Sequence, residues 1–279
     1  MGKTYLRFPG FKLKALTLSY DDGSRQDKRL IEIMKKYGIK GTFNINSGLF
    51  DPEYTGVEKG RMSKKEVLDL YTDSGMEVAV HGYHHLSLAC VNNTIATKDV
   101  LTDRIELEKM FGKIIKGMAY ANGSYDDDVV AILENCGINY SRTVVSTENF
   151  NIPTDWLRLP ATCHHNNPKL MEFAKKFVEF KHQPYYWSNS PKLFYLWGHS
   201  YEFDTHDNWH VIEEFCKYVG NRDDIWYATN GEIYDYVKAV DSLEFSADTT
   251  MVHNPSAIDV YIDYLNKEHI IHAGETIIL

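Results

Sequence analysis

The sequence predicts an α/β protein, an irregular (β/α) barrel of about seven parallel strands that carries a short C-terminal β-appendage. Short apolar runs of strand length alternate with amphipathic runs of helix length along most of the 279 residues. The number of these units favours a barrel-like closure over a doubly wound sheet. Beyond residue 241 the helical pattern stops, and only strand-like alternation continues.

Strands and helices are expected in pairs through the first half of the chain. The strands are expected at residues 14–19, 41–46, 76–80, 114–120 and 138–144. The helices are expected at residues 25–37, 63–75, 97–111 and 126–137. Ser63 is followed three residues later by Glu66, which is the spacing of a capping box, so this helix should begin there.

The second half is less regular before the alternation resumes. Prolines at positions 153, 160, 168 and 184 predict long loops between residues 146 and 190, with one helix at 168–180. A strand, a helix, a strand and a helix are then expected at residues 193–198, 209–219, 224–229 and 232–240. We assign residues 1–240 to the barrel domain and residues 241–279 to a β-rich extension packed on it, because so short a segment cannot hold a core of its own.

Composition argues against several classes of partner. Hydrophobic residues are 43% and charged residues 25% of the chain, which is ordinary for a folded globular protein. The net charge of -9 and the lack of a basic run argue against a nucleic-acid partner. No apolar stretch is long enough to span a bilayer, so no membrane partner is expected. Because the N-terminus has no apolar leader core, the sequence as written predicts a cytoplasmic protein, or a secreted one if a leader was removed.

Cysteine and glycine patterns narrow the possible cofactors. The four cysteines are scattered and form no Cys-x-x-Cys pair, so neither a disulfide framework nor a structural zinc site is expected. No glycine-rich phosphate loop follows a predicted strand, which weighs against a nucleotide cofactor. The oligomeric state is left open by these patterns.

Residues capable of chemistry stand just beyond the carboxyl ends of the predicted strands. Asp21 and Asp22 follow the first strand. His81 follows the third strand, Asn122 the fourth, and His199 a late one. In parallel α/β folds these strand ends share one face of the molecule, where sites are built. We therefore expect these side chains to converge.

A histidine pair supplies this face with ligands for a metal ion. His81 and His85 stand at i and i+4, which on a helical turn point the same way. A carboxylate from the first strand end would complete a His-His-Asp set that leaves a position for water. Taken singly, the carboxylates favour a turn and the histidines a surface loop, but their placement on one face favours a site. We expect a divalent ion, zinc before cobalt, nickel or iron.

Five motifs, in this order, resemble those of the polysaccharide deacetylases, carbohydrate esterase family 4. They are Tyr20-Asp21-Asp22-Gly23, the His81/His85 pair, Ala119-Tyr120-Ala121-Asn122-Gly123, Asp155-Trp156 and Leu196-Trp197-Gly198-His199. The first two are close matches, the third and fourth are degenerate, and the fifth keeps its histidine. The resemblance spans about residues 14–239 and implies an irregular (β/α) barrel. It also implies a metal-dependent hydrolase that removes N-acetyl or O-acetyl groups from a sugar, oligosaccharide or polysaccharide.

The resemblance assigns the metal and the general base. Asp22, His81 and His85 would bind the divalent ion, and Asp21 would take a proton from water. Family members commonly hold the base with an arginine that opens the third motif, but Ala119 stands at that position.

The remaining catalytic roles also come from the resemblance. The backbone N–H of Asn122 would donate to the oxyanion, and His199 would be the general acid, oriented by Asp155. Arg142 and Arg158 are candidates to replace the missing arginine, and we favour Arg158, which lies near Asp155 in the sequence.

Some side chains have two open interpretations. The Cys163-His164-His165 run could form a second metal site or line the substrate groove, and we favour a groove-side role for one histidine. Several aromatic residues could stack on a sugar or pack in the core: Tyr185, Tyr186, Trp187, Trp197 and Tyr201. Two rival functions stay open as well, an amidohydrolase acting on a small non-sugar amide and a catalytically weak carbohydrate-binding protein that retains the metal site.

Overall fold

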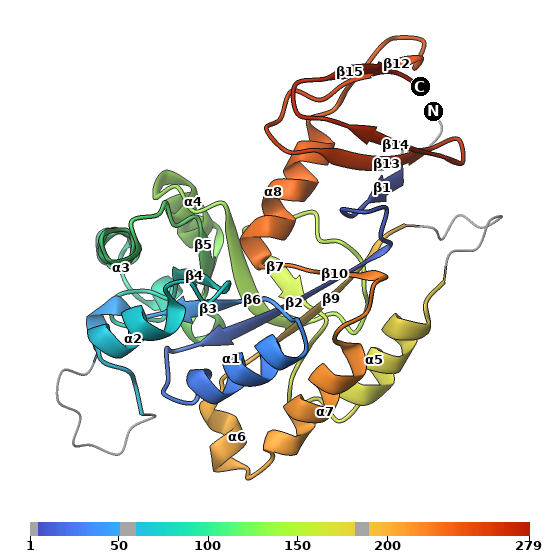
Figure 1. The fold of residues 1–279 in the computed structure, drawn as a ribbon. Coiled ribbons are helices and arrows are strands. Elements are labelled where there is room, and N and C mark those ends of the chain that lie inside the picture. Colours follow the sequence, from blue (N-terminus) through green and yellow to red (C-terminus); the bar gives the residue numbers. More distant parts are fainter. Residues whose placement is uncertain (1–4, 51–59, 182–189) are drawn as a thin grey trace.

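A curved sheet of parallel strands forms the centre of the molecule in the computed structural model, which describes residues 5–50, 60–181 and 190–279 (Figure 1). In chain order its strands are β2 (Lys14–Asp21), β3 (Gly41–Ile45), β4 (Glu77–Val80), β5 (Gly117–Ala119), β6 (Tyr140–Ser146), β7 (Leu159–Ala161), β8 (Cys163–His164), β9 (Lys192–Gly198) and β10 (Ile225–Tyr227). They are hydrogen-bonded in the order β7-β6-β5-β4-β3-β2-β9-β8, and β10 also pairs with β2. The predicted parallel α/β fold is confirmed.

The two ends of this strand order meet at one segment of the chain. Only Thr162 separates β7, which pairs with β6, from β8, which pairs with β9. The N–H of Thr162 donates to the Tyr195 carbonyl at 2.8 Å, and the Thr162 carbonyl accepts from the N–H of Glu148 at 2.9 Å. Residues 159–164 therefore connect β6 to β9, which gives the sheet the expected barrel-like shape.

This segment corrects one expectation about the loops. Residues 146–190 were expected to contain a helix but no strand, whereas β7 and β8 lie within that range. Pro160 stands inside β7, where pairing with β6 is irregular. A proline ordinarily argues against a strand inside a sheet, because it lacks the N–H that the hydrogen-bond ladder needs. For this reason the sequence did not predict β7.

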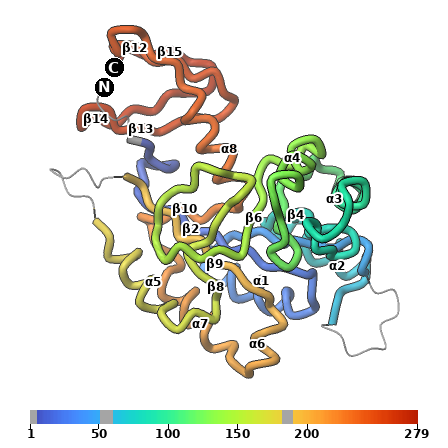
Figure 2. The backbone as a smooth tube through the Cα atoms, turned by 180° about the vertical axis from the view of Figure 1, so that it is seen from behind, coloured from blue at the N-terminus to red at the C-terminus, as the bar shows by residue number. Residues whose placement is uncertain are grey.

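Helices cover the outer surface of the sheet. They are α1 (Asp27–Lys36), α2 (Lys64–Tyr71), α3 (Asn93–Phe111), α4 (Asp127–Asn135), α5 (Leu170–Glu179), α6 (Tyr201–Thr205), α7 (Trp209–Val219) and α8 (Asn230–Asp241). The short 3-10 turns are η1 (Ser47–Leu49), η2 (Leu88–Cys90) and η3 (Ala121–Gly123). Helices α1, α5 and α7 lie along one side of the sheet, and α2, α3 and α4 along another (Figures 1 and 2). Ser63 and Glu66 form the predicted capping box of α2.

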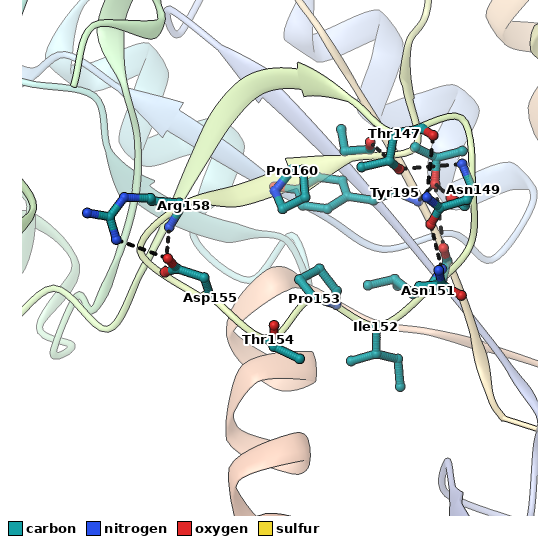
Figure 3. A pocket seen from close by; sticks show the side chains of 13 residues that line it. Thr147, Asn149, Asn151, Ile152, Pro153, Thr154, Asp155, Arg158, Pro160 and Tyr195 are labelled. Atoms are coloured by element: carbon teal, nitrogen blue, oxygen red, sulfur yellow. Dashed lines mark hydrogen bonds and ion pairs between the residues drawn. The ribbon is translucent and has the colours of Figure 1, made fainter. Parts of the chain in front are cut away.

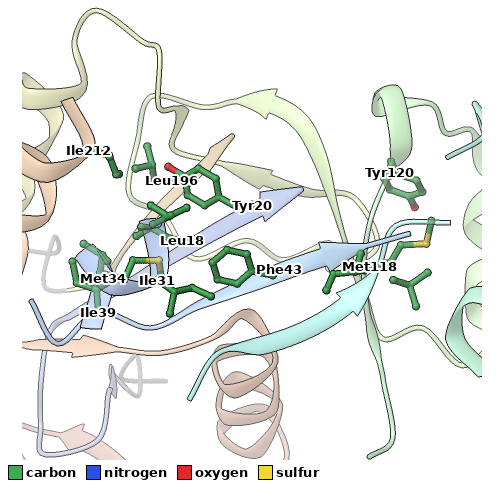
Figure 4. Close-up of a cluster of buried hydrophobic side chains, with 14 of the residues drawn as sticks. Leu18, Tyr20, Ile31, Met34, Ile39, Phe43, Met118, Tyr120, Leu196 and Ile212 are labelled. Carbon is green, nitrogen blue, oxygen red and sulfur yellow. The ribbon is translucent and has the colours of Figure 1, made fainter. Parts of the chain in front are cut away.

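The side chains of β2 alternate between two environments. Leu16, Leu18 and Tyr20 belong to the large apolar cluster between the sheet and the helices (Figure 4). Ala15 belongs to a second cluster on the opposite side of the strand. Because successive strand residues point to opposite faces, Asp21 shares the side of Ala15 and faces the barrel interior. The strand pattern thus delivers a carboxylate to the carboxyl end of the barrel.

The C-terminal segment consists of antiparallel strands. Its strands are β11 (Glu244–Phe245), β12 (Met251–His253), β13 (Val260–Tyr264), β14 (Lys267–Ile271) and β15 (Thr276–Ile278). β13 and β14 form a sheet with β1 (Tyr5–Arg7), while β11, β12 and β15 form another. A buried ion pair, Arg7 Nη2 to Asp263 Oδ2 at 2.7 Å, ties β1 to β13. Our division into residues 1–240 and 241–279 stays a proposal, and β1 crosses it.

Across the three described ranges, none of the helices has both the length and the apolarity that a bilayer span requires.

Candidate metal and catalytic site

The three predicted ligands converge at the carboxyl ends of β2 and β4. The Asp22 Oδ1 atom lies 3.9 Å from Nε2 of His81 and 3.4 Å from Nε2 of His85. One candidate ligand atom from each residue lies within 4.8 Å of the other two. This spacing is compatible with three ligands around one divalent cation.

The histidine pair converges through a turn and not through the helical turn that its spacing suggested. Gly82 has φ 81° and His85 has φ 56°, so the chain leaves β4 in left-handed conformations that no helix contains. A Cβ at Gly82 would lie 2.8 Å from Oδ2 of Asp99, which excludes larger residues there. The expectation of an i, i+4 helical face is corrected, although the two rings still meet, with centroids 4.9 Å apart.

Helix α3 holds this turn with two carboxylates one helical turn apart. Oδ1 of Asp99 accepts from the N–H of His84 at 3.0 Å and contacts Nδ1 of the same residue at 2.8 Å. Oδ2 of Asp103 accepts from the N–H of His81 at 3.0 Å. His84 is thereby turned toward α3, which leaves His81 and His85 facing the site.

His81 is held in the tautomer that a metal ligand needs. Its Nδ1 lies 2.8 Å from the carbonyl oxygen of Ala119, which can only accept, so Nδ1 carries the hydrogen and Nε2 keeps its lone pair. Nε2 is buried and has no hydrogen-bond partner among the residues that the structure describes. Burial also lowers the pKa of His81, which favours the neutral ring. The residues present therefore fit a divalent cation.

Arg61 adds a positive charge that the sequence motifs did not reveal. Its Nη2 lies 3.1 Å from Oδ1 of Asp22, and its Nη1 donates to the Asp22 carbonyl at 2.7 Å. Nη1 also donates to Asn46 Oδ1 at 2.8 Å. Burial would raise the pKa of Asp22, but the charges of His81 and Arg61 outweigh it, so the pKa is lowered and the carboxylate stays ionised.

Asp21 is held by Arg142, which corrects the preference for Arg158. A guanidinium nitrogen of Arg142 contacts Oδ2 of Asp21, and Asn44 Nδ2 donates to Oδ1 at 2.8 Å. Burial alone would raise the pKa of Asp21, but the surrounding charges, that of Arg142 foremost, bring it to about 2. Arg142 is fully buried, and its guanidinium lies 4.2 Å from the ring centroid of Trp197.

Arg158 and Asp155 lie elsewhere and bind each other. Arg158 Nη1 is 3.0 Å from Oδ2 of Asp155, and Nη2 is 2.5 Å from Oδ1 of Asp127. Asp155 Oδ1 also accepts from the N–H groups of Leu157 and Arg158 in the same turn. Both residues line a pocket on the loop before β7 (Figure 3). These local contacts hold both side chains. Contrary to our expectation, Arg158 does not hold Asp21 and Asp155 does not orient His199.

His199 stands between Asp21 and a carboxylate that was not predicted. Its Nε2 lies 3.9 Å from Oδ2 of Asp21, and its Nδ1 lies 3.3 Å from Oε1 of Glu202 in α6. Glu202 therefore occupies the place expected for Asp155. Burial would lower the pKa of His199, but contact with Glu202 and the charge of Asp21 outweigh it, so the pKa is raised. The available signal was spacing, because Glu202 follows His199 by three residues.

Both histidines of the Cys163-His164-His165 run also reach Glu202. Nε2 of His164 lies 3.3 Å and Nε2 of His165 2.8 Å from Glu202 Oε2. Cys163 is buried in the apolar core. These three residues, His164, His165 and Glu202, are also close enough to hold an ion.

The remaining candidates are placed as follows. Asn122 lies in η3 with φ 56°, and its Nδ2 donates to Oγ of Ser87 at 3.1 Å. Of the aromatic candidates, Trp197 is 8% exposed and supports Arg142 rather than forming a surface platform. Tyr201 lies beside His199, with ring centroids 5.2 Å apart. The Tyr185-Tyr186-Trp187 run lies outside the described residues.

The barrel-like α/β sheet carries paired aspartates and a His-x-x-x-His turn at its strand ends. A family model described as polysaccharide deacetylase matches residues 10–141 of this chain. The recognition from the sequence motifs is confirmed. This match supports a deacetylase activity on carbohydrates.

Solved structures extend the likeness of fold to most of the chain. A Mycobacterium smegmatis protein assigned as a polysaccharide deacetylase has a TM-score of 0.58 and 16% identity, covering 86% of this chain and 96% of its own. A family 4 carbohydrate esterase from Streptomyces lividans in complex with acetate has a TM-score of 0.51 and 12% identity, covering 78% and 93%. The Xyl-CE4 domain of a multidomain xylanase from the hindgut metagenome of Trinervitermes trinervoides has a TM-score of 0.52 and 13% identity, covering 81% and 92%. No curated protein matches this sequence. At such identities the structural likeness concerns the fold alone.

Proposed function

We propose that this protein is a metal-dependent hydrolase that removes N-acetyl or O-acetyl groups from a sugar, oligosaccharide or polysaccharide. The observation that carries the proposal is the position of Asp21 between two imidazoles. Its Oδ2 lies 3.8 Å from Nε2 of His81, on the metal side, and 3.9 Å from Nε2 of His199, on the acid side. The candidate base, Asp21, thus lies between the candidate metal ligands and the candidate acid, His199.

Asp22, His81 and His85 would hold the metal, and zinc is our first choice over cobalt, nickel or iron. When bound there, a divalent ion lowers the pKa of a water molecule and polarises the acetyl carbonyl. His81 serves this role as a neutral ligand, because Ala119 fixes its hydrogen on Nδ1. The buried carboxylate of Asp22 contributes the balancing negative charge.

Asp21 would take the proton of the attacking water. With a pKa of about 2 its carboxylate is ionised at every pH at which the protein is expected to work. Arg142 and Asn44 each hold one of its oxygens, so its position is fixed before substrate arrives. The ion pair with Arg142 weakens its proton affinity, so geometry rather than basicity makes it the base.

His199 would donate a proton to the departing amine or alcohol. Its raised pKa keeps a larger share of the ring protonated near neutral pH than an ordinary histidine has. Nε2 is the nitrogen turned toward Asp21, so it is the atom that would donate. The backbone N–H of Asn122 is our candidate donor to the oxyanion, by its position in the third motif.

Acetate release separates the candidate substrates. We would measure it with N-acetylglucosamine oligomers, O-acetylated xylan oligomers and a set of small cyclic and linear amides. Release from acetylated sugars supports the proposal, whereas turnover confined to the small amides would establish the amidohydrolase alternative.

The third candidate, a weakly catalytic carbohydrate-binding protein, drew its support from the arginine missing in the third motif. Arg142 contacts the carboxylate that this arginine would hold, which removes that support. Binding of the oligomers without measurable acetate release, in metal-loaded protein, would favour this candidate over ours.

A further inference from the structure

We infer that Glu202 is the positioning residue for the general acid His199, and that His165 in turn fixes Glu202. The inference rests on the proposed function and extends it to residues outside the five motifs. It replaces the expected pair of Asp155 and His199 by a chain of three side chains, His165, Glu202 and His199.

Each oxygen of the Glu202 carboxylate faces a different part of this chain. Oε1 lies 3.3 Å from Nδ1 of His199, while Oε2 lies 2.8 Å from Nε2 of His165 and 3.3 Å from Nε2 of His164. One carboxylate therefore contacts three imidazoles. Burial opposes ionisation, but contacts with these rings outweigh it and lower the pKa of Glu202, so it is an anion.

Ring tautomers agree with this arrangement. Nδ1 of His164 accepts from the N–H of Asn166 at 3.2 Å, so the hydrogen of the neutral ring sits on Nε2, which faces Glu202. A metal ligand would need a lone pair on Nε2 instead. His165 Nε2 makes no hydrogen bond of good geometry with Glu202, but its 2.8 Å separation from Oε2 is shorter than the distance of about 3.3 Å between two atoms bound to one zinc ion. We therefore interpret the cluster as a proton-holding chain and not as a second metal site.

His165 is built into the core, which makes it a fixed support. It is fully buried, and its ring packs between Tyr20 and Phe203, with centroids 5.7 and 4.3 Å away. Its backbone N–H donates to the backbone carbonyl of Trp197 at 2.9 Å. A Cβ at Gly198 would collide with the His165 ring, so only glycine admits the ring at this place. A side chain so confined can position a neighbour.

The consequence for the reaction follows from the two nitrogens of His199. When Glu202, 3.3 Å away, keeps the hydrogen on Nδ1, the proton on Nε2 is the one available to the substrate. When the carbon–nitrogen bond of the tetrahedral adduct breaks, the amine nitrogen takes that proton and the acyl group leaves as acetate. His199 is then neutral with its hydrogen on Nδ1. Without Glu202 the ring can hold its hydrogen on either nitrogen, and its charged form loses a stabilising neighbour.

The groups that act on the charge of His199 come from three places in the fold. They are Asp21 and Asp22 at the end of β2, Glu202 in α6, and His164 and His165 at the end of β8. Among these groups, within the residues that the structure describes, only Glu202 contacts Nδ1 of His199. Replacing it should therefore change His199 without disturbing the metal ligands.

The test compares Glu202→Gln with the matched surface variant Glu213→Gln, whose carboxylate pairs with Lys36 on the outside of α7. Zinc-loaded proteins are assayed on an N-acetylglucosamine oligomer and on 4-nitrophenyl acetate, whose leaving group needs no proton. For Glu202→Gln we expect kcat on the oligomer to fall about 100-fold with KM unchanged, and 4-nitrophenyl acetate turnover to stay within a few-fold. Equal losses on both substrates would overturn the inference.

His165 is tested through coupling. His165→Phe removes the donor, whereas His165→Gln keeps an N–H near the Nε2 position and should restore most of the lost kcat. In the Glu202→Gln background His165→Phe should have no further effect on kcat, because it acts through Glu202. Fully additive losses would refute this order. Zinc that exceeds one ion per chain, and returns to one in His164→Ala, would also refute the inference, since the cluster would then be a metal site.

A measurement independent of activity separates this inference from the proposed function. The pKa of His199, followed by NMR titration of zinc-loaded protein, should fall in Glu202→Gln and stay unchanged in Glu213→Gln. If no substrate is turned over, the proposed function fails while this titration still decides the contact. An unchanged His199 pKa in Glu202→Gln would overturn it.

Discussion

Arg142 contacts the carboxylate of Asp21 in the barrel interior, where their side chains are 0% and 3% exposed. The pair links β6 to the end of β2, two strands that are not neighbours in the sheet. It therefore spans the barrel and fixes the candidate base.

Arg142→Met should reduce both stability and activity. It leaves Asp21 buried without its main positive neighbour, and removing one member of a buried pair costs about 3–5 kcal/mol of unfolding free energy. The pKa of Asp21 should rise, since burial would no longer be outweighed. Urea unfolding and kcat at neutral pH measure the two effects.

Arg158→Met is the matched control. Arg158 pairs with two carboxylates at the surface, where water screens their charges, so its loss should leave the free energy of unfolding and kcat nearly unchanged. A larger loss of activity in Arg158→Met than in Arg142→Met would reverse our assignment of the residue that holds the base.

Asp21→Asn should separate metal binding from turnover. The amide keeps the shape of the side chain but cannot take a proton, so kcat should fall by about 10²–10⁴-fold. Asp22 and the two histidines are untouched, so the metal content should stay at the parent level. Unchanged kcat would remove Asp21 from the mechanism, and loss of metal would make it a ligand.

Because of Asp27, we expect the free energy of unfolding to fall as pH rises toward neutral. This fully buried carboxyl accepts from Oγ of Ser200 at 2.5 Å and from the Tyr71 hydroxyl at 2.6 Å, and burial raises its pKa from 3.8 to about 7. Between these two values the folded protein binds a proton that the unfolded chain has released, so stability should fall as pH rises from about 4 to 7.

The loss from Asp27 alone is on the order of 4 kcal/mol across that window. Buried Asp103, whose pKa is also raised to about 7, adds to it with the same sign. Asp27→Asn should therefore make the slope shallower without abolishing it, as measured by urea unfolding at pH 5 and pH 8. An identical slope in parent and variant would show that Asp27 does not titrate in this range.

The candidate metal ligands could be predicted from the sequence because strand ends of a parallel fold share one face. The βα rhythm and the residue types indicated His81, His85 and a carboxylate from the first strand end, and the choice of Asp22 over Asp21 came from the family resemblance. Their detailed geometry could not be predicted, because two carboxylates of α3 hold the N–H groups of His81 and His84 in the turn that leads to His85.

The partners of the catalytic candidates could not be assigned from spacing. Arg142 and Arg158 differ in which way they face, and that is set by the register of β6 and by a local turn around Asp155. Glu202 belongs to no recognised motif. Its contact with His165 depends on the short strands β7 and β8, which Pro160 made hard to predict. Long-range register, rather than local propensity, decided each of these cases.

The metal content of the protein tests the central claim most directly. Elemental analysis of the native protein should find about one divalent transition-metal ion per chain, and loss of the ion in His85→Ala and in His81→Ala. His84→Ala, whose ring faces Asp99 instead, should keep it. A parent protein without bound metal, or one that keeps its ion after either ligand is removed, would contradict the account.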